Sequence, residues 1–281
     1  MAVNKVEYND NGQLKTLIDL TADTVTADKL AKGYTAHDMS GNIITGTLES
    51  SGGSSDDVCK QIVERTGTSL TLPSSITIIG KYAFHRWGTL QSVTIPQGVT
   101  SIGADAFSYC SALTSITIPE SVTEIGNYAF SLCTKLTSIT IPSTVTSLGS
   151  NAFEHCPLTS ITIPSTVTEI KSYTFSQCTK LTSVTISEGV SKILSYAFNG
   201  CNALTSITIP STVTEIADSA FKFCNSLTSV TFKGTPGSIH RDAFFSCSAL
   251  TDIYVPWSEG AVSGAPWGAT NATIHYNHTT T

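Results

Sequence analysis

The cysteines are the residues of this chain with the widest range of possible chemistry. Seven of the eight lie three residues after a phenylalanine and recur at one spacing: Cys110, Cys133, Cys156, Cys178, Cys201, Cys224 and Cys247. A zinc site needs ligands that converge on a point, as in C-x-x-C pairs, whereas evenly spaced thiols form a line. The spacing therefore predicts a row of small apolar side chains inside a core. Disulfide bonds between neighbouring cysteines of this row are the alternative, although an odd number of thiols cannot pair completely.

The remaining candidate catalytic residues form no recognisable constellation. The six histidines are scattered along the chain, at His37, His85, His155, His240, His275 and His278. No G-x-S-x-G, H-E-x-x-H, P-loop or paired-carboxylate spacing occurs. The sequence predicts no catalytic residue, no metal ligand and no cofactor, so we do not expect an enzyme.

Charge and hydropathy exclude two further classes of partner. The net charge is -6, with nine acidic and four basic residues within positions 1–57, and no basic stripe follows that would neutralise phosphates. No apolar run approaches the roughly 18 residues that cross a bilayer. The first residues lack the pattern of a signal peptide. We expect no nucleic-acid binding, no membrane insertion and synthesis in the cytoplasm.

A period of 23 residues organises most of the chain, with one step of 22 beside Pro157. In the unit 113–135, apolar and hydroxyl side chains alternate over 113–118, as in a half-buried strand, and Pro119 ends that strand. The predicted core ladder consists of the seven cysteines and of phenylalanines in one column: Phe107, Phe130, Phe153, Phe175, Phe198 and Phe221. One unit cannot bury such side chains alone, so we expect stacked coils with a shared core.

The repeated pattern L-x-x-I/V-x-I/L resembles the leucine-rich repeat, and the longer string LTSITIPxxVTxIGxxAFxxC resembles the BspA-type bacterial repeats. This resemblance implies a β-rich solenoid of about eight coils plus caps. The asparagine usual in the leucine-rich pattern is absent, and Ser121, Thr144 and Thr166 stand in that region. We expect their hydroxyl groups to bond the turn backbone in its place.

The domain organisation follows from the limits of the repeat. We assign the solenoid to 67–256 and a helical N-terminal cap to 58–66, where acidic residues open an apolar pattern that ends at Gly67. Residues 49–57 read as a flexible Gly/Ser linker, and 1–48 as a small β-rich module with a hairpin over 33–48. Residues 257–281 form the C-terminal cap and tail, in which Trp257 and Trp267 cover the core.

Two terminal segments suggest a biological setting. The string GYTAHDMSGNIITGTL, with the residues before it, resembles a module of tail-associated proteins of Firmicutes phages and prophages. The string DIYVPWSEGAVSGAPWGATNATIHYN resembles the closing segment of leucine-rich-repeat proteins from such loci. The resemblance implies that residues 1–48 attach the chain to a virion; a generic β-rich anchor is the alternative.

Two surfaces are candidates for ligand binding. The first is the outward face of the strands, with a column of Thr117, Thr140, Thr162, Thr185 and Thr208. The second lies around each core phenylalanine, where the repeats differ most: Tyr82, Arg86, Tyr109, Tyr128, Tyr173 and Tyr196, together with pairs such as Lys222-Phe223. Exposed tyrosines favour recognition, although the same residues can half-bury along the core edge. The alternative for the threonine column is that it only favours strand formation and keeps the face soluble. The column also resembles the threonine grids of ice-binding solenoids, which is the weaker interpretation.

Three hypotheses for function follow. The first is a phage or prophage tail protein whose repeats present a recognition surface to a cell-surface protein or glycan, with residues 1–48 contacting other tail proteins. The second is a BspA-like adhesin on the bacterial surface. The third is a scaffold without a ligand. A homo-oligomer is compatible with each of them, although no heptad pattern specifies one.

Overall fold

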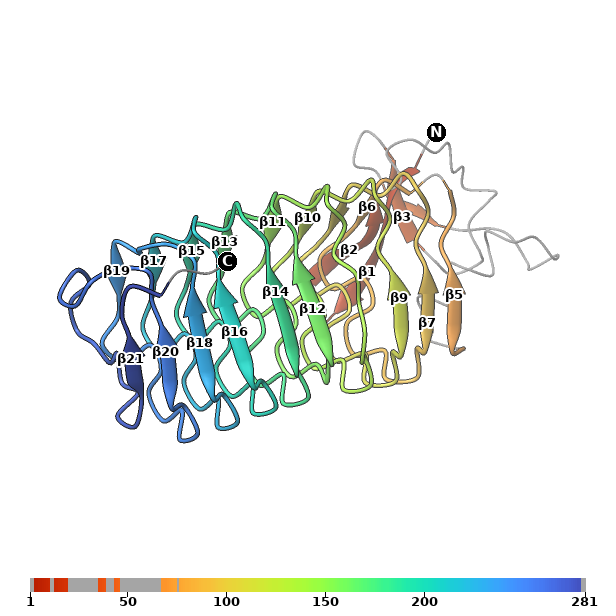
Figure 1. Cartoon of the computed structure of the whole chain (residues 1–281). Coiled ribbons are helices and arrows are strands. Elements are labelled where there is room, and N and C mark those ends of the chain that lie inside the picture. The colour runs from red at the N-terminus through yellow and green to blue at the C-terminus, as the bar shows by residue number, and fades with distance from the viewer. Residues whose placement is uncertain are drawn as a thin grey trace.

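The computed structural model describes the strand backbone of residues 3–10, 13–19, 35–38 and 43–45, and the whole of residues 67–74 and 76–278. The repeats form a parallel solenoid. Its coils stack side by side from the end that carries β5 to the end that carries β21 (Figure 1). The described part of the chain contains no helix long and apolar enough to span a membrane.

One side of the coils carries strands that run parallel to one another, although the equivalent segment of one coil, residues 137–140, forms no strand. These strands are β5 (Ser69–Thr71), β7 (Ser92–Thr94), β9 (Ser115–Thr117), β12 (Ser160–Ile163), β14 (Ser183–Ile186), β16 (Ser206–Ile209), β18 (Ser229–Phe232), β20 (Asp252–Tyr254) and β21 (Thr273–His275). The pairing is in register, so that Thr94 lies between Thr71 and Thr117. The alternation of hydroxyl and apolar residues predicted from sequence therefore becomes an exposed face of Ser and Thr above a buried face of Ile and Val.

The opposite side of the coils carries a second parallel ladder of two-residue strands. These are β6 (Ile78–Ile79), β8 (Ser101–Ile102), β10 (Glu124–Ile125), β11 (Ser147–Leu148), β13 (Glu169–Ile170), β15 (Lys192–Ile193), β17 (Glu215–Ile216) and β19 (Ser238–Ile239). Their second residues are buried and their first residues face outward. On the outer side, Lys192 Nζ lies 3.5 Å from a carboxylate oxygen of Glu215. The partly exposed pair adds little stability.

The N-terminal module extends this second ladder. Its strands β1 (Val3–Asp10), β2 (Gln13–Asp19), β3 (Thr35–Asp38) and β4 (Ile43–Thr45) pair antiparallel, and β2 also pairs antiparallel with β6. The predicted hairpin within 33–48 is confirmed as β3–β4, whereas β1 was not anticipated. The sheet of this module is continuous with the second ladder of the solenoid, and β2 covers the edge of β6 that faces away from β8 (Figure 1).

Two other N-terminal predictions, the linker at 49–57 and the helical cap at 58–66, lie outside the described residues. At the other end, the parallel ladder continues past the predicted boundary at residue 256, because β21 pairs with β20 in register. Trp257 and Trp267 are buried, and both rings pack against Phe232. The two indoles thus cover the end of the core, and the segment expected only to cap the solenoid also contributes a strand.

The core consists of columns of equivalent side chains. The phenylalanines of the predicted ladder are fully buried and stack on one another, with ring centroids 5.2–5.5 Å apart and interplanar angles of 2–10°. Phe84 and Phe244 extend this stack at its two ends. The solenoid core predicted from the 23-residue period is therefore confirmed, with every phenylalanine and cysteine of the predicted ladder turned inward.

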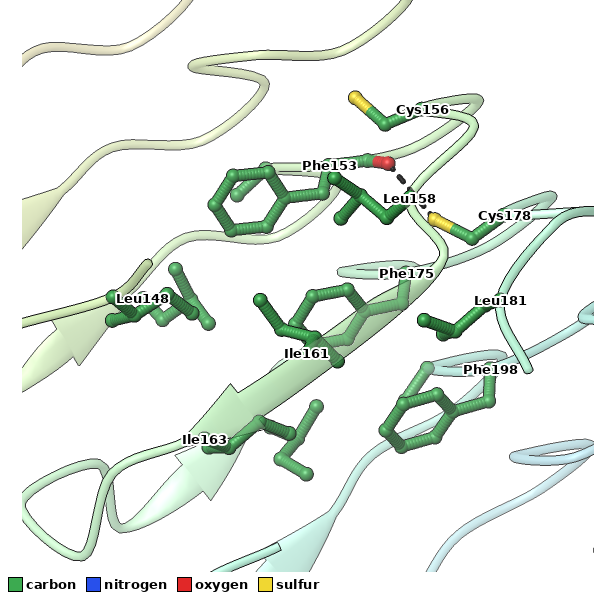
Figure 2. Close-up of a cluster of buried hydrophobic side chains, with 14 of the residues drawn as sticks. Leu148, Phe153, Cys156, Leu158, Ile161, Ile163, Phe175, Cys178, Leu181 and Phe198 are labelled. Carbon is green, nitrogen blue, oxygen red and sulfur yellow. Dashed lines mark hydrogen bonds between the residues drawn. The ribbon is translucent and has the colours of Figure 1, made fainter. Parts of the chain in front are cut away.

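The shortened coil beside Pro157 is absorbed in a loop. Across it, Phe153 and Phe175 remain stacked at 5.5 Å, and Cys178 still reaches the carbonyl oxygen of Phe153 (Figure 2). The strand ladders are interrupted there, because the coil between β9 and β12 has no strand and β11 is not paired with β13. The backbone N–H of Thr159 still donates to the carbonyl oxygen of Thr137 at 3.1 Å, and Thr182 repeats this bond to Thr159 one coil later. The missing residue thus leaves the equivalent columns aligned and the side-chain stack intact.

Hydroxyl groups replace the asparagine that leucine-rich repeats use, as the sequence predicted. Ser121, Thr144 and Thr166 each donate a hydrogen bond to the carbonyl oxygen of a valine one coil earlier, at 2.7, 2.8 and 2.6 Å. Thr212 repeats the bond to Val190 at 2.8 Å. Because each bond crosses between coils, it satisfies a turn carbonyl and joins two units.

Candidate recognition surfaces

The variable positions around each core phenylalanine have an unusual backbone. In all coils but the last, the residues two before and two after the phenylalanine adopt the left-handed conformation, for example Asp105 and Tyr109 on either side of Phe107, with φ of 56° and 61°. This conformation is unfavourable for side chains other than glycine, asparagine and aspartate. It directs alternate N–H groups at the next coil, so that Asp105, Phe107 and Tyr109 donate to its carbonyl oxygens at 2.7–2.9 Å. The inter-coil bonds compensate the local strain.

Because these positions lie at bends, their side chains project outward along one border of the solenoid. We call this border the aromatic edge and define it by the aromatic residues at these positions, together with Phe245, which directly follows a core phenylalanine: Tyr82, Tyr109, Tyr128, Tyr173, Tyr196, Phe223 and Phe245. The exposed fractions of Tyr109, Tyr128, Tyr173, Phe223 and Phe245 are 37–45 %, whereas Tyr82 and Tyr196 are half-buried. The structure thus leaves three of the five predicted tyrosines exposed and two half-buried.

Cations accompany the rings at the N-terminal end of the aromatic edge. Lys81 Nζ lies 4.7 Å from the ring centroid of Tyr82, and Arg86 lies over Tyr109 at 5.3 Å. His85 contacts both tyrosine rings edge-on. The structure therefore brings together three residues that the sequence singled out, Tyr82, Arg86 and Tyr109.

A second cluster occupies the C-terminal half. The rings of Tyr173 and Tyr196 stack with centroids 4.8 Å apart and an interplanar angle of 5°. Lys222 lies 5.1 Å from the ring of Phe223, 5.2 Å from that of Phe245 and 6.0 Å from that of Tyr196. Burial, followed by the neighbouring Tyr196, raises the pKa of Tyr173, so its phenol stays protonated and able to donate. The ammonium group of Lys222 thus lies near three aromatic rings from adjacent coils.

Sequence reasoning missed Phe245 as a member of this edge and did not place Lys222 at its centre. The signal was available, because Phe245 follows the core Phe244 and therefore shares a repeat column with Lys222. The repeat pattern alone did not show that Lys222 contacts Phe245 in the next coil as well as Phe223 in its own. The contact with Phe245 depends on the distance between adjacent coils.

The face of β5 to β21 that carries Ser and Thr, here the Ser/Thr face, is the second candidate surface. All five predicted threonines, Thr117, Thr140, Thr162, Thr185 and Thr208, are exposed on it. Towards the C-terminus, the threonine column ends in Tyr254 and His275, whose rings stack at 4.6 Å. The Ser/Thr face is regular and uncharged over most of its length, and it offers hydroxyl groups without large apolar anchors.

The cysteine column is not a reactive site. The seven thiols in the described residues are free and buried, and each donates a hydrogen bond of 3.0–3.3 Å to the carbonyl oxygen of a core phenylalanine one coil earlier. Burial raises the pKa of the Cys201 thiol to about 12. The thiolate is the form that acts as a nucleophile and as a metal ligand, so buried thiols that stay protonated are unreactive. The predicted core role holds, and the disulfide alternative is not realised.

Comparison with protein families gives one match. A model described as "BspA type Leucine rich repeat region" matches in 6 copies, over residues 64–182 and 168–262. No curated protein matches the sequence.

Solved structures show similar folds. A leucine-rich repeat protein from Bacteroides ovatus superposes with a TM-score of 0.59 at 23 % identity, covering 98 % of this chain and 76 % of that one. A leucine-rich repeat protein of T. pallidum shares 30 % identity over 49 % of this chain and 64 % of its own, with a TM-score of 0.46. A leucine-rich cell surface protein from Faecalibacterium prausnitzii, 23 % identical, covers 97 % of this chain and 95 % of its own at a TM-score of 0.41. The similarity to the Bacteroides ovatus protein supports a solenoid of leucine-rich repeats.

Proposed function

This chain belongs to the BspA type leucine-rich-repeat family, and we propose that it is a non-catalytic binding protein whose aromatic edge recognises a protein on a cell surface. The family fold supports a binding or scaffold role. The observation that carries the choice of surface is the C-terminal cluster, in which Lys222 is shared by three aromatic rings beside the stacked pair Tyr173–Tyr196.

The composition of the aromatic edge favours a protein partner. Tyrosine and arginine are enriched among the residues that dominate protein interfaces, because they bring large contact areas at a small cost in side-chain entropy. The rings of Tyr173 and Tyr196 stack and so cover one face of each other, which fixes the orientation of the pair. The cations along a chain of net charge -6 add selectivity for an acidic partner.

For the biological setting, we propose a phage or prophage tail in which residues 1–48 attach the chain to the virion and the solenoid faces the target cell. The support is the resemblance of the two terminal segments to phage modules. The continuous pairing of β2 with β6 adds a mechanical argument, because it would transmit load from an attachment module directly into the solenoid. Family membership favours the second candidate, a BspA-like adhesin displayed on the bacterial surface.

Binding of the full chain to whole bacterial and host cells tests the proposal. The edge variants Tyr196→Asn, Lys222→Asn and Phe223→Ser use residues that the chain already carries in the same columns, at Asn151, Asn199 and Ser246. The backbone conformation should therefore survive. We expect each variant to weaken binding about tenfold or more, as for residues at the centre of an interface.

The matched control is Thr185→Ser on the Ser/Thr face, which should bind as the unaltered chain does. If Thr185→Ser loses binding and the edge variants keep it, the recognition surface is the Ser/Thr face. Inhibition of binding by free glycans and not by protease treatment of the cells would replace the protein target with a glycan. Absence of binding to every cell tested would favour the scaffold.

The setting is tested separately. Immunogold labelling of particles induced from the host strain should place the protein on tails, and neighbouring tail, holin or lysin genes would agree with that position. Labelling of the cell envelope in the absence of particles would instead support the surface adhesin. Removal of residues 1–57 should abolish incorporation into particles while binding to target cells remains.

A further inference from the structure

We propose that Asp218, His240 and Asp242 form a binding site for a divalent transition metal, with Zn²⁺ as the best match. One ligand atom from each residue, a carboxylate oxygen or an imidazole nitrogen, lies within 4.8 Å of the other two. The sequence predicted no metal ligand, because the histidines are far apart along the chain. Stacking of the last coils brings one of them between two aspartates.

The position of His240 explains why this cluster occurs once among the residues that the structure describes. The residue four before the core phenylalanine is glycine in the early coils, as at Gly103, where an added Cβ would lie 2.7 Å from the backbone nitrogen of Lys81. After the shortened coil, the column accepts larger residues, and in the last coil it holds His240. Asp218, one coil earlier, then lies beside it.

The hydrogen bonds around His240 point to a cation. The backbone N–H of Asp242 donates to His240 Nδ1 at 3.2 Å, so this nitrogen carries a lone pair. A carboxylate oxygen of Asp218 faces the same nitrogen, also at 3.2 Å. A single nitrogen cannot accept from the N–H and donate to the carboxylate together. The two lone pairs repel each other. A proton on Nδ1, or a metal ion bound by both atoms, removes this repulsion. A bound metal ion would take the Nδ1 lone pair in place of the N–H group of Asp242, whose bond of 3.2 Å is long.

The separation fits zinc coordination. Bonds of about 2.0–2.1 Å to nitrogen and oxygen in a tetrahedron place neighbouring ligand atoms about 3.3–3.5 Å apart. The Asp218–His240 distance is close to this value. Asp242, whose side chain is 38 % exposed, can turn its carboxylate inward; its partner Arg241 is 83 % exposed and holds it only at the surface. One imidazole and two carboxylates match the nitrogen and oxygen ligands that zinc accepts.

An open pocket of about 460 Å³ adjoins the cluster and gives a metal ion access from solvent. Asp218 and His240 line it together with Glu215 from β17, which adds a further carboxylate, and with Ser263 and Gly264 of the C-terminal segment. Three protein ligands leave a coordination position for water or for a group of a binding partner. The last coil thus combines ligands, negative charge and space.

Zn²⁺ titration of the chelator-treated full chain, followed by calorimetry, tests the proposal. We expect one site that His240→Gln and Asp218→Asn each weaken at least tenfold. Asp218→Asn is the sharper variant, because its amide can donate to His240 Nδ1 and satisfy the fold while removing the anionic ligand. The matched control is His275→Gln, since His275 bonds Asp252 at 2.7 Å in a pair outside this cluster; it should leave this site unchanged.

Co²⁺ provides a second readout that does not depend on stability. Coordination by His240 and the two aspartates should give visible d–d bands that disappear in Asp218→Asn, without the thiolate charge-transfer absorption of a cysteine site. Equal Zn²⁺ affinity in the unaltered chain and in both ligand variants would overturn the proposal. A thiolate band, or the absence of any Zn²⁺ binding by the full chain, would overturn it as well.

Discussion

The thiol of Cys178 donates a hydrogen bond of 3.2 Å to the carbonyl oxygen of Phe153, one coil earlier in the solenoid (Figure 2). The same bond recurs at every cysteine of the column, and each one joins two adjacent units. A residue type that suggests redox or metal chemistry therefore has a structural role here. It satisfies buried carbonyl groups where a longer polar side chain would not fit.

Removal of one thiol should lower stability measurably. Cys178→Ala eliminates the bond to Phe153 and leaves a small cavity in a fully packed core, so we expect a loss of about 1–2 kcal/mol in the free energy of unfolding. Urea denaturation followed by circular dichroism measures it. The neighbouring exposed Thr179→Ala serves as control and should change stability by less than about 0.5 kcal/mol.

Alkaline pH should destabilise the protein through the same column. Burial raises the pKa of the Cys201 thiol from 9.0 to about 12, so between these values the unfolded chain loses protons that the folded chain retains. Stability should be at its full value below pH 9.0 and decline above it. Labelling with a thiol reagent at pH 8 checks the accessibility, because the seven buried cysteines should react only after denaturant is added. Rapid labelling of several thiols in the native state would contradict the structure.

The hydroxyl ladder makes a separate prediction. Thr166→Val keeps the shape of the side chain and removes the bond of 2.6 Å to the carbonyl oxygen of Val145. Loss of the hydrogen bond to this buried carbonyl should lower the free energy of unfolding by about 1–3 kcal/mol. The urea midpoint should fall, while the slope of the free energy against urea concentration stays the same. Thr162→Val, on the exposed Ser/Thr face, tests whether valine alone is harmful, and it should behave almost as the original chain does.

Close contact between coils should make some glycines irreplaceable. An added Cβ at Gly126 would lie 2.5 Å from the backbone nitrogen of Ala104, so Gly126→Ala must push two coils apart, at a cost of about 1–3 kcal/mol. At Gly98 the nearest atom would be at 3.5 Å, in ordinary contact. Gly98→Ala should therefore be tolerated. Thermal unfolding of the two variants compares them directly, and equal midpoints would refute the tight approach at Gly126.

The N-terminal strands should protect an edge. Without residues 1–57, Ile78 and Ile79 of β6 lose the pairing with β2, and an unpaired edge is a template for another chain. Sedimentation velocity should show concentration-dependent association of the truncated chain and a smaller species for the full chain. A truncated chain that remains monomeric and equally stable would show that the pairing of β2 with β6 contributes little.

Much of this structure follows from the sequence alone. The 23-residue period, the inward columns and the hydroxyl groups in place of asparagine were all predictable, because strand alternation and turn chemistry are local properties that each unit repeats. Exposure of the threonine column followed from the same alternation. The sequence also indicated that the tyrosine positions vary, without deciding which of them face solvent.

Tertiary structure decided the contacts between units. The pairing of β2 with β6, the position of Lys222 between Phe223 and Phe245, and the approach of His240 to Asp218 all join residues that are distant or offset by about one coil. Such contacts depend on the rise and register of neighbouring coils. A repeat pattern determines what each coil presents, but packing of coil on coil determines which side chains meet.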